Sequence, residues 1–222
     1  MAAADEPPPA IAALKPMLEG VSAITLDELL RIASDCHVSG LMTGKAGVLH
    51  LHLGDGVRGL DLVRRALDQT ELPPRVFWPT HVNRQRRLME EAIAVAARGC
   101  VIDVTAFPAD DESYSAEDAI ILYLERGLPP ERITCSSDGA GCLPVFDSEG
   151  KLVEMDIGRP MALWEAMVAL LRRGVPIPRA VAPFTSNVAR HLRLKQKGRI
   201  AVEESGLPEL IPVISRRQDS KS

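Results

Sequence analysis

Residues 47–53 read GVLHLHL, residues 57–70 read VRGLDLVRRALDQT and residues 76–82 read VFWPTHV. The first and third segments are short apolar runs typical of strands, and the second places its apolar side chains at helical spacing. A strand, a helix and a strand in this order are typical of parallel pairing. Pro79 predicts that pairing of the second strand ends there, because proline has no N–H for a ladder.

The same alternation continues on both sides of this stretch. Upstream, Thr25 and Glu28 form a capping-box pattern that predicts a helix start, and Gly40 predicts its end. Downstream, the sequence predicts helices over residues 85–98 and from Ser115 to Gly127, and strands over residues 101–105 (VIDVT) and 133–136 (ITCS). Strands that alternate with helices in this way predict an α/β fold with a mainly parallel sheet.

The chain divides into three predicted regions: a flexible lead over residues 1–16, one domain over residues 17–200 and a divergent, partly disordered tail over residues 201–222. Late in the domain, the sequence predicts a hairpin or extended loop over residues 141–150 and helices over residues 161–173 and 178–194.

Composition narrows the class of protein. The 222 residues are 46% hydrophobic and 25% charged, with a net charge of −4, which is typical of a soluble globular protein. No apolar run approaches the roughly 18 residues of a membrane span, and net acidity argues against a nucleic-acid partner. The N-terminus lacks signal-peptide features, and four cysteines without C-x-x-C spacing are typical of reduced, buried thiols. We therefore expect a cytoplasmic protein.

Chemistry-bearing side chains gather at the predicted strand ends. His50 and His52 are two apart and so share one face of their strand, His81 ends the next strand, and Asp138 ends the fourth. In parallel α/β folds this edge carries the functional site. Imidazole and carboxylate suit zinc, which would lower the pKa of bound water and polarise a carbonyl. A nearby carboxylate would then move the proton, which is the chemistry of amide hydrolysis.

A second motif competes for this place. Gly54, Gly56 and Gly59 fit G-x-G-x-x-G between a strand and a helix, where a dinucleotide-binding turn is expected. Asp55 lies inside it and would repel a pyrophosphate, and His81 stands where a ribose-binding acid is needed. A tight glycine turn is the simpler interpretation.

Five segments carry a resemblance to a known family: HLGD at 52–55, PTHVNR at 79–84, IDVT at 102–105, CSSDG at 135–139 and TSNVAR at 185–190. In this order they resemble isoaspartyl dipeptidase (beta-aspartyl peptidase), a metallopeptidase of the amidohydrolase superfamily. The likeness runs from about Asp27 to Ile200.

The resemblance implies a partial (β/α)8 barrel of about four parallel βα units, equivalent to strands five to eight, without the N-terminal half and the small β-domain. It implies that His52 and His81 hold zinc and that Asp138 contacts metal and acts as general base and acid. Arg84 matches an arginine that binds a substrate carboxylate, and Cys142 stands where the family has a substrate-contacting serine. The implied reaction is cleavage of beta-aspartyl dipeptides by metal-activated water.

The sequence also departs from the family pattern. His50 replaces an apolar residue of the family and is not a ligand by this alignment, and Ala140 replaces an asparagine. The family has a carboxylated lysine that bridges its two metal ions, and Lys15 is no secure counterpart of it. We expect one bound ion rather than two, and a homo-oligomer, because a half-barrel leaves strand edges open. The alternatives are a catalytically inactive interaction subunit, an amidohydrolase acting on cyclic amides, and a nucleotide-binding module.

Overall fold

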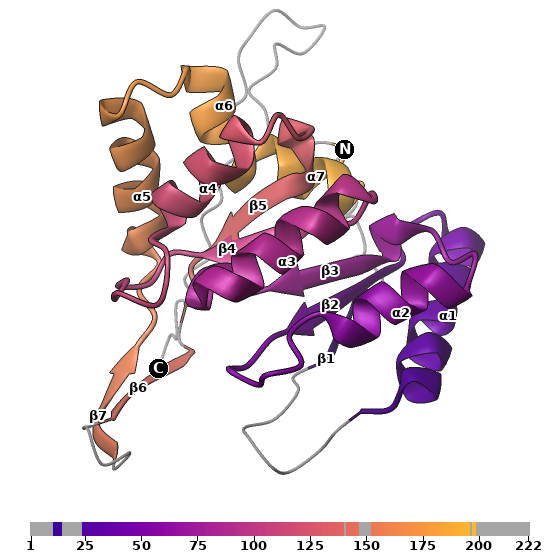
Figure 1. Ribbon diagram of the computed structural model, residues 1–222. Coiled ribbons are helices and arrows are strands. Elements are labelled where there is room, and N and C mark those ends of the chain that lie inside the picture. Colours follow the sequence, from indigo (N-terminus) through magenta and orange to yellow (C-terminus); the bar gives the residue numbers. More distant parts are fainter. Residues whose placement is uncertain (1–10, 15–23, 140, 147–151, 196, 199–222) are drawn as a thin grey trace, which may run out of the picture.

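The computed structural model describes residues 11–14, 24–139, 141–146, 152–195 and 197–198 (Figure 1). Its strands are β1 (Ile11–Leu14), β2 (Val48–His52), β3 (Phe77–Thr80), β4 (Ile102–Thr105), β5 (Ile133–Ser136), β6 (Cys142–Phe146) and β7 (Leu152–Ile157). Its α-helices are α1 (Leu26–Thr43), α2 (Asp61–Gln69), α3 (Arg86–Ala97), α4 (Ala116–Glu125), α5 (Met161–Arg172), α6 (Ile177–Val181) and α7 (Ser186–His191). The predicted tail over residues 201–222, Lys15 and Ala140 lie outside the described residues.

The predicted α/β class is confirmed. β1, β2 and β3 form one parallel ladder in that order, and β4 and β5 form a second parallel ladder. Helices follow β2, β3 and β4 along the chain, and α2, α3 and α4 lie in front of the strands in Figure 1. β1 falls inside the predicted flexible lead, where the sequence predicted no strand.

Pairing of β3 runs through Pro79, contrary to the prediction that it would end there. Pro79 is opposite Leu51, and Thr80 is opposite His52. The described strands place β3 at the edge of its ladder, with β2 as its hydrogen-bonded neighbour. An edge strand tolerates proline, because the missing N–H can face the side on which no neighbouring strand is hydrogen-bonded.

Gly40 does not end the first helix. Thr25 caps α1 through the predicted box with Glu28, but the helix continues to Thr43 and ends at Gly44, whose φ is 70°. A Cβ on Gly40 would lie 2.5 Å from the backbone nitrogen of Gly47. The glycine is therefore needed where the helix crosses the start of β2, not for a turn.

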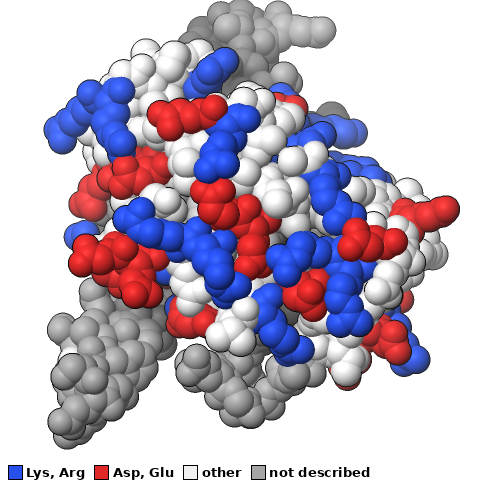
Figure 2. All heavy atoms as spheres, viewed as in Figure 1, with Lys and Arg blue, Asp and Glu red and all other residues white. Residues whose placement is uncertain are grey.

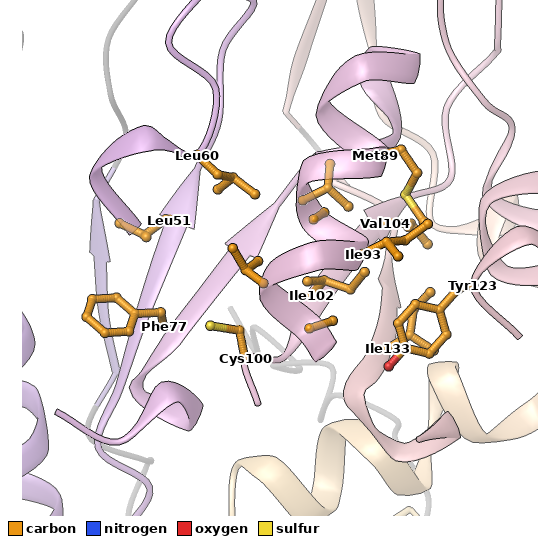
Figure 3. Packing of buried hydrophobic residues seen from close by; sticks show 14 of the residues in the cluster. Leu51, Leu60, Phe77, Met89, Ile93, Cys100, Ile102, Val104, Tyr123 and Ile133 are labelled. Atoms are coloured by element: carbon orange, nitrogen blue, oxygen red, sulfur yellow. The ribbon is translucent and has the colours of Figure 1, made fainter. Parts of the chain in front are cut away.

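One face of the parallel strands forms the hydrophobic core (Figure 3). Leu49 and Leu51 from β2, and Phe77 from β3, are buried on the side that packs against the helices. Each such side chain contributes about 1.5–3 kcal/mol on burial. The core continues through Ile102, Val104, Ile133, Met89, Ile93, Ile120 and Tyr123. The opposite face of the strands therefore carries the alternate side chains, which include both β2 histidines.

The C-terminal part differs in detail from its prediction. The structure has an antiparallel pair, β6–β7, but its second strand spans Leu152–Ile157 and so lies beyond the predicted range of 141–150. The helix predicted over residues 178–194 is interrupted: α6 ends at Val181, a 3-10 turn spans Ala182–Phe184, and α7 begins at Ser186. Pro183 lies within the turn, and proline has no N–H to continue an α-helix.

The helical face seen in Figure 2 carries charges of both signs side by side. Ion pairs join Arg64 to Glu91, Arg126 to Glu90 and Arg173 to Asp118. Of the helices that the structure describes, none combines the length and apolar character that crossing a membrane requires.

Candidate metal-binding and catalytic site

The structure brings His52, His81 and Asp138 together. His52 ends β2, His81 directly follows β3, and Asp138 follows β5. Nδ1 of His52 lies 3.1 Å from Nε2 of His81, and Nε2 of His81 lies 3.9 Å from Oδ2 of Asp138. Residues separated by 29 and 57 positions, counted from their numbers (81 − 52 and 138 − 81), therefore meet at one point.

Backbone geometry at this point is unusual. His81 has a φ of 62° and Asp138 a φ of 45°, both in the left-handed region that L residues rarely adopt. Glycines make room for Asp138: a Cβ on Gly141 would lie 2.7 Å from its Cγ, and one on Gly158 would collide with its carbonyl oxygen. Strain of this kind persists where surrounding contacts determine the conformation, and it is frequent at functional sites.

Side chains from β4 and the loop after β3 fix the imidazole of His81. Its Nδ1 lies 2.7 Å from Oγ1 of Thr105, which leaves Nε2 directed at His52. Asn83 is fully buried and binds both backbone groups of Thr105, accepting from its N–H at 2.8 Å and donating to its carbonyl at 3.0 Å. Asn83 and Thr105 were not among the site residues predicted from the sequence, although both lie in segments that carried the resemblance.

Burial keeps His81 neutral. Its side chain is 12% exposed, and desolvation lowers the pKa of His81 to about 4, although the charge of Asp138 acts in the opposite direction. Burial also lowers the pKa of His50. A neutral imidazole is the form that ligates metal, so His81 is in a ligating form at neutral pH.

A buried carboxylate lies beneath the histidines. Asp103 of β4 is 3% exposed and accepts hydrogen bonds of 2.6 Å from the hydroxyls of Thr80, Thr134 and Ser136. Desolvation raises the pKa of Asp103 in spite of these donors. The carboxyl links β3, β4 and β5 on the face that carries the site, where the described strands show no ladder between β3 and β4.

Replacing Asp103 tests this link. Asp103→Ala is expected to lower the free energy of unfolding by about 3 kcal/mol, because three hydroxyls lose their acceptor. Asp103→Asn retains an acceptor and is expected to cost less.

Since burial raises the pKa of Asp103, ionisation above the unfolded pKa of about 3.9 opposes folding. The wild type therefore loses stability relative to Asp103→Asn as the pH rises from 3 to 7. Urea unfolding at both pH values measures this, and equal stability of all three proteins would contradict it.

The two histidines fit a divalent ion in chemistry and spacing. Two nitrogens at about 2.0–2.1 Å from one tetrahedral ion lie roughly 3.3 Å apart, close to the 3.1 Å between His52 and His81. Thr105 orients His81 as an outer-shell partner would. Among the described residues, however, no three His, Cys, Asp or Glu side chains form a complete ligand group.

The structure also describes His50, Arg84 and the backbone of Cys142. His50 contacts the ring of His52 edge-on, with centroids 4.9 Å apart, and also contacts Trp78. Arg84 contacts Asp55 and the Leu53 carbonyl after β2. The backbone of Cys142 pairs with Ile157, and its side chain is outside the described part of the chain.

The glycine motif has a structural role. Gly59 has a φ of 48°, and a Cβ there would lie 2.5 Å from Oε2 of Glu91. That carboxylate accepts from the Leu60 N–H at 2.9 Å, at the start of α2. The place where a nucleotide phosphate would sit is thus taken by the protein's own carboxylate, which disfavours the nucleotide-binding interpretation.

No family model matches this chain. Its fold is similar to the crystal structure of a beta-aspartyl dipeptidase from Fervidobacterium islandicum AW-1, a thermophilic keratin degrader, in complex with beta-Asp-Leu. The TM-score is 0.73 at 38% identity, over 81% of this chain and 47% of that one. A second beta-aspartyl dipeptidase structure from the same organism gives a TM-score of 0.68 at 35% identity, over 80% and 44%. The chain thus spans just under half the length of these relatives, and the predicted resemblance is confirmed.

Proposed function

We propose, from the similarity of this chain to beta-aspartyl dipeptidases, that it takes part in metal-dependent hydrolysis of beta-aspartyl dipeptides. The meeting of His52, His81 and Asp138 carries the proposal. In a chain 38% identical to a dipeptidase crystallised with beta-Asp-Leu, this arrangement supports an amide-hydrolysing site rather than a structural histidine pair.

In this proposal His52 and His81 hold one zinc ion, with Asp138 beside it. The ion would supply Lewis-acid polarisation of the scissile carbonyl. Thr105 keeps the His81 ring turned so that Nε2 faces the site. Burial holds His81 neutral, so that it remains a ligand and does not compete for the proton.

Asp138 moves the proton. A water molecule attacks the carbonyl carbon of the beta-aspartyl bond, a C–O bond forms, and Asp138 takes the proton that the water loses. The C–N bond then breaks, and Asp138 donates that proton to the leaving amine. The Asp138 side chain is 28% exposed, so substrate and water can reach it.

Arg84 binds a carboxylate of the dipeptide. Its planar guanidinium can hold a carboxylate through two parallel N–H donors, which suits a substrate with free carboxylates. Cys142, the first residue of β6, is also proposed to contact the substrate.

We further propose that this chain forms part of a (β/α)8 barrel. Strands β2 to β5 would correspond to strands five to eight of a (β/α)8 barrel. Coverage of just under half of each dipeptidase supports this correspondence. Self-association into a homo-oligomer and a cytoplasmic location stay predictions.

Comparing two isomeric dipeptides tests the function. With zinc added, the protein is expected to release leucine from beta-Asp-Leu faster than from alpha-Asp-Leu, because the site must distinguish the side-chain linkage. Amine release followed by chromatography measures both rates. A folded, zinc-supplemented protein that releases no leucine from beta-Asp-Leu would contradict the proposal and favour the inactive interaction subunit.

A further inference from the structure

The guanidinium of Arg84 is held by the loop that follows β2. Its Nε lies 2.7 Å from Oδ1 of Asp55 in an ion pair that is not aligned as a hydrogen bond. Nη2 donates to Oδ2 of Asp55 at 3.2 Å, and Nη1 donates to the carbonyl of Leu53 at 2.8 Å. Two partners thus hold the guanidinium at different nitrogens, which restricts its rotation.

These contacts connect the segment that follows His52 with the segment that follows His81. Asp55 follows His52 by three residues, and Arg84 follows His81 by three residues. Gln85 adds a further link, donating from Nε2 to the carbonyl of Asp55 at 3.1 Å. The positive charge of Arg84 also acts on His81, where it helps to lower the pKa of the imidazole.

Donors remain on the arginine. A guanidinium carries five N–H groups, and its hydrogen bonds to Leu53 and Asp55 use one N–H on Nη1 and one on Nη2. One N–H is left on Nη1 and one on Nη2. Two parallel donors on the terminal nitrogens are the pair that grips a carboxylate.

We propose that Asp55 is a positioning residue for Arg84: it fixes the plane of the guanidinium so that the terminal N–H pair meets a substrate carboxylate. This inference rests on the proposed function for the carboxylate and on the ion pair for the positioning. The side chain of Asp55 is 56% exposed and that of Arg84 35%, so both can be reached from solvent.

Kinetics of full-length, zinc-supplemented variants test the role. Asp55→Ala is expected to raise KM for beta-Asp-Leu about tenfold, the effect of losing roughly one charge-assisted hydrogen bond, with kcat changed less than twofold. Asp55→Glu is expected to restore part of the loss. In an Arg84→Ala background, adding Asp55→Ala is expected to change KM no further. Asp68→Asn is the matched control, because Asp68 forms a 2.7 Å ion pair with Arg98.

Two kinetic outcomes would overturn the inference. A lower KM in Asp55→Ala would mean that Asp55 competes with the substrate for Arg84. An equal rise of KM with and without Arg84 would mean that Asp55 acts through something else.

A spectroscopic arm separates this inference from the proposed function. The ¹⁵N–¹H signal of the Arg84 Nε–H, assigned by its loss in Arg84→Ala, is expected to shift and exchange faster with solvent in Asp55→Ala but not in Asp68→Asn. An unchanged signal in Asp55→Ala overturns the positioning role. Failure of the wild type to cleave or bind beta-Asp-Leu overturns the substrate part, while the signal still decides whether Asp55 holds Arg84.

Discussion

Asp138→Asn is expected to lower kcat for beta-Asp-Leu about 100- to 10,000-fold, the range that a positioned proton-transfer group supplies. Asparagine has nearly the same shape and, like aspartate, tolerates the left-handed backbone that Asp138 adopts at a φ of 45°. The substitution therefore removes the charge and the proton acceptor while keeping the loop. Initial-rate kinetics at saturating zinc measure the effect.

The control for this variant is Asp118→Asn. Asp118 is a carboxylate that forms a 2.6 Å ion pair with Arg173 on the helical face, and Asp118→Asn is expected to leave kcat within twofold. If Asp138→Asn retained wild-type kcat, another group would have to move the proton.

His81→Ala is expected to weaken zinc binding at least about 100-fold. Loss of outer-shell partners alone costs 10- to 100-fold in metal affinity, and His81 is proposed as a direct ligand. Because His81 has a φ of 62°, alanine adds backbone strain. His81→Gly, which tolerates positive φ, separates the missing ligand from that strain. Isothermal titration with zinc measures both variants.

His50→Gln serves as the comparison for the histidine variant. His50 lies on the same strand and the same face as His52, and the two rings touch. The proposed site does not use it, so His50→Gln is expected to bind zinc within threefold of the wild type. Equal zinc affinity in the wild type, His81→Ala and His81→Gly would exclude the site.

The alternation of strands and helices from β2 to β5 could be predicted from the sequence, because each of these strands is a short, mainly apolar run and each helix between them shows apolar spacing, a cap or a stop. The convergence of His52, His81 and Asp138 could also be predicted. All three follow parallel strands, and the carboxyl ends of such strands share one edge.

What the sequence could not supply depends on contacts between segments. Asp103 has no local signal, because its role arises from three hydroxyls on two other strands, β3 and β5. Gly40 looks like a helix stop, but a glycine is needed there because α1 passes too close to Gly47 to leave room for a Cβ. Asp55 looked like an obstacle to a phosphate, and only the loop conformation reveals Arg84 as its partner.

Zinc K-edge X-ray absorption of the zinc-loaded wild-type protein reports the atoms around the ion, and so tests whether His52 and His81 bind it. We expect one zinc per chain with nitrogen and oxygen neighbours at about 2.0–2.2 Å, including imidazole scattering that is lost in His81→Gly. Sulfur neighbours at about 2.3 Å, or imidazole scattering unaffected by that substitution, would contradict it.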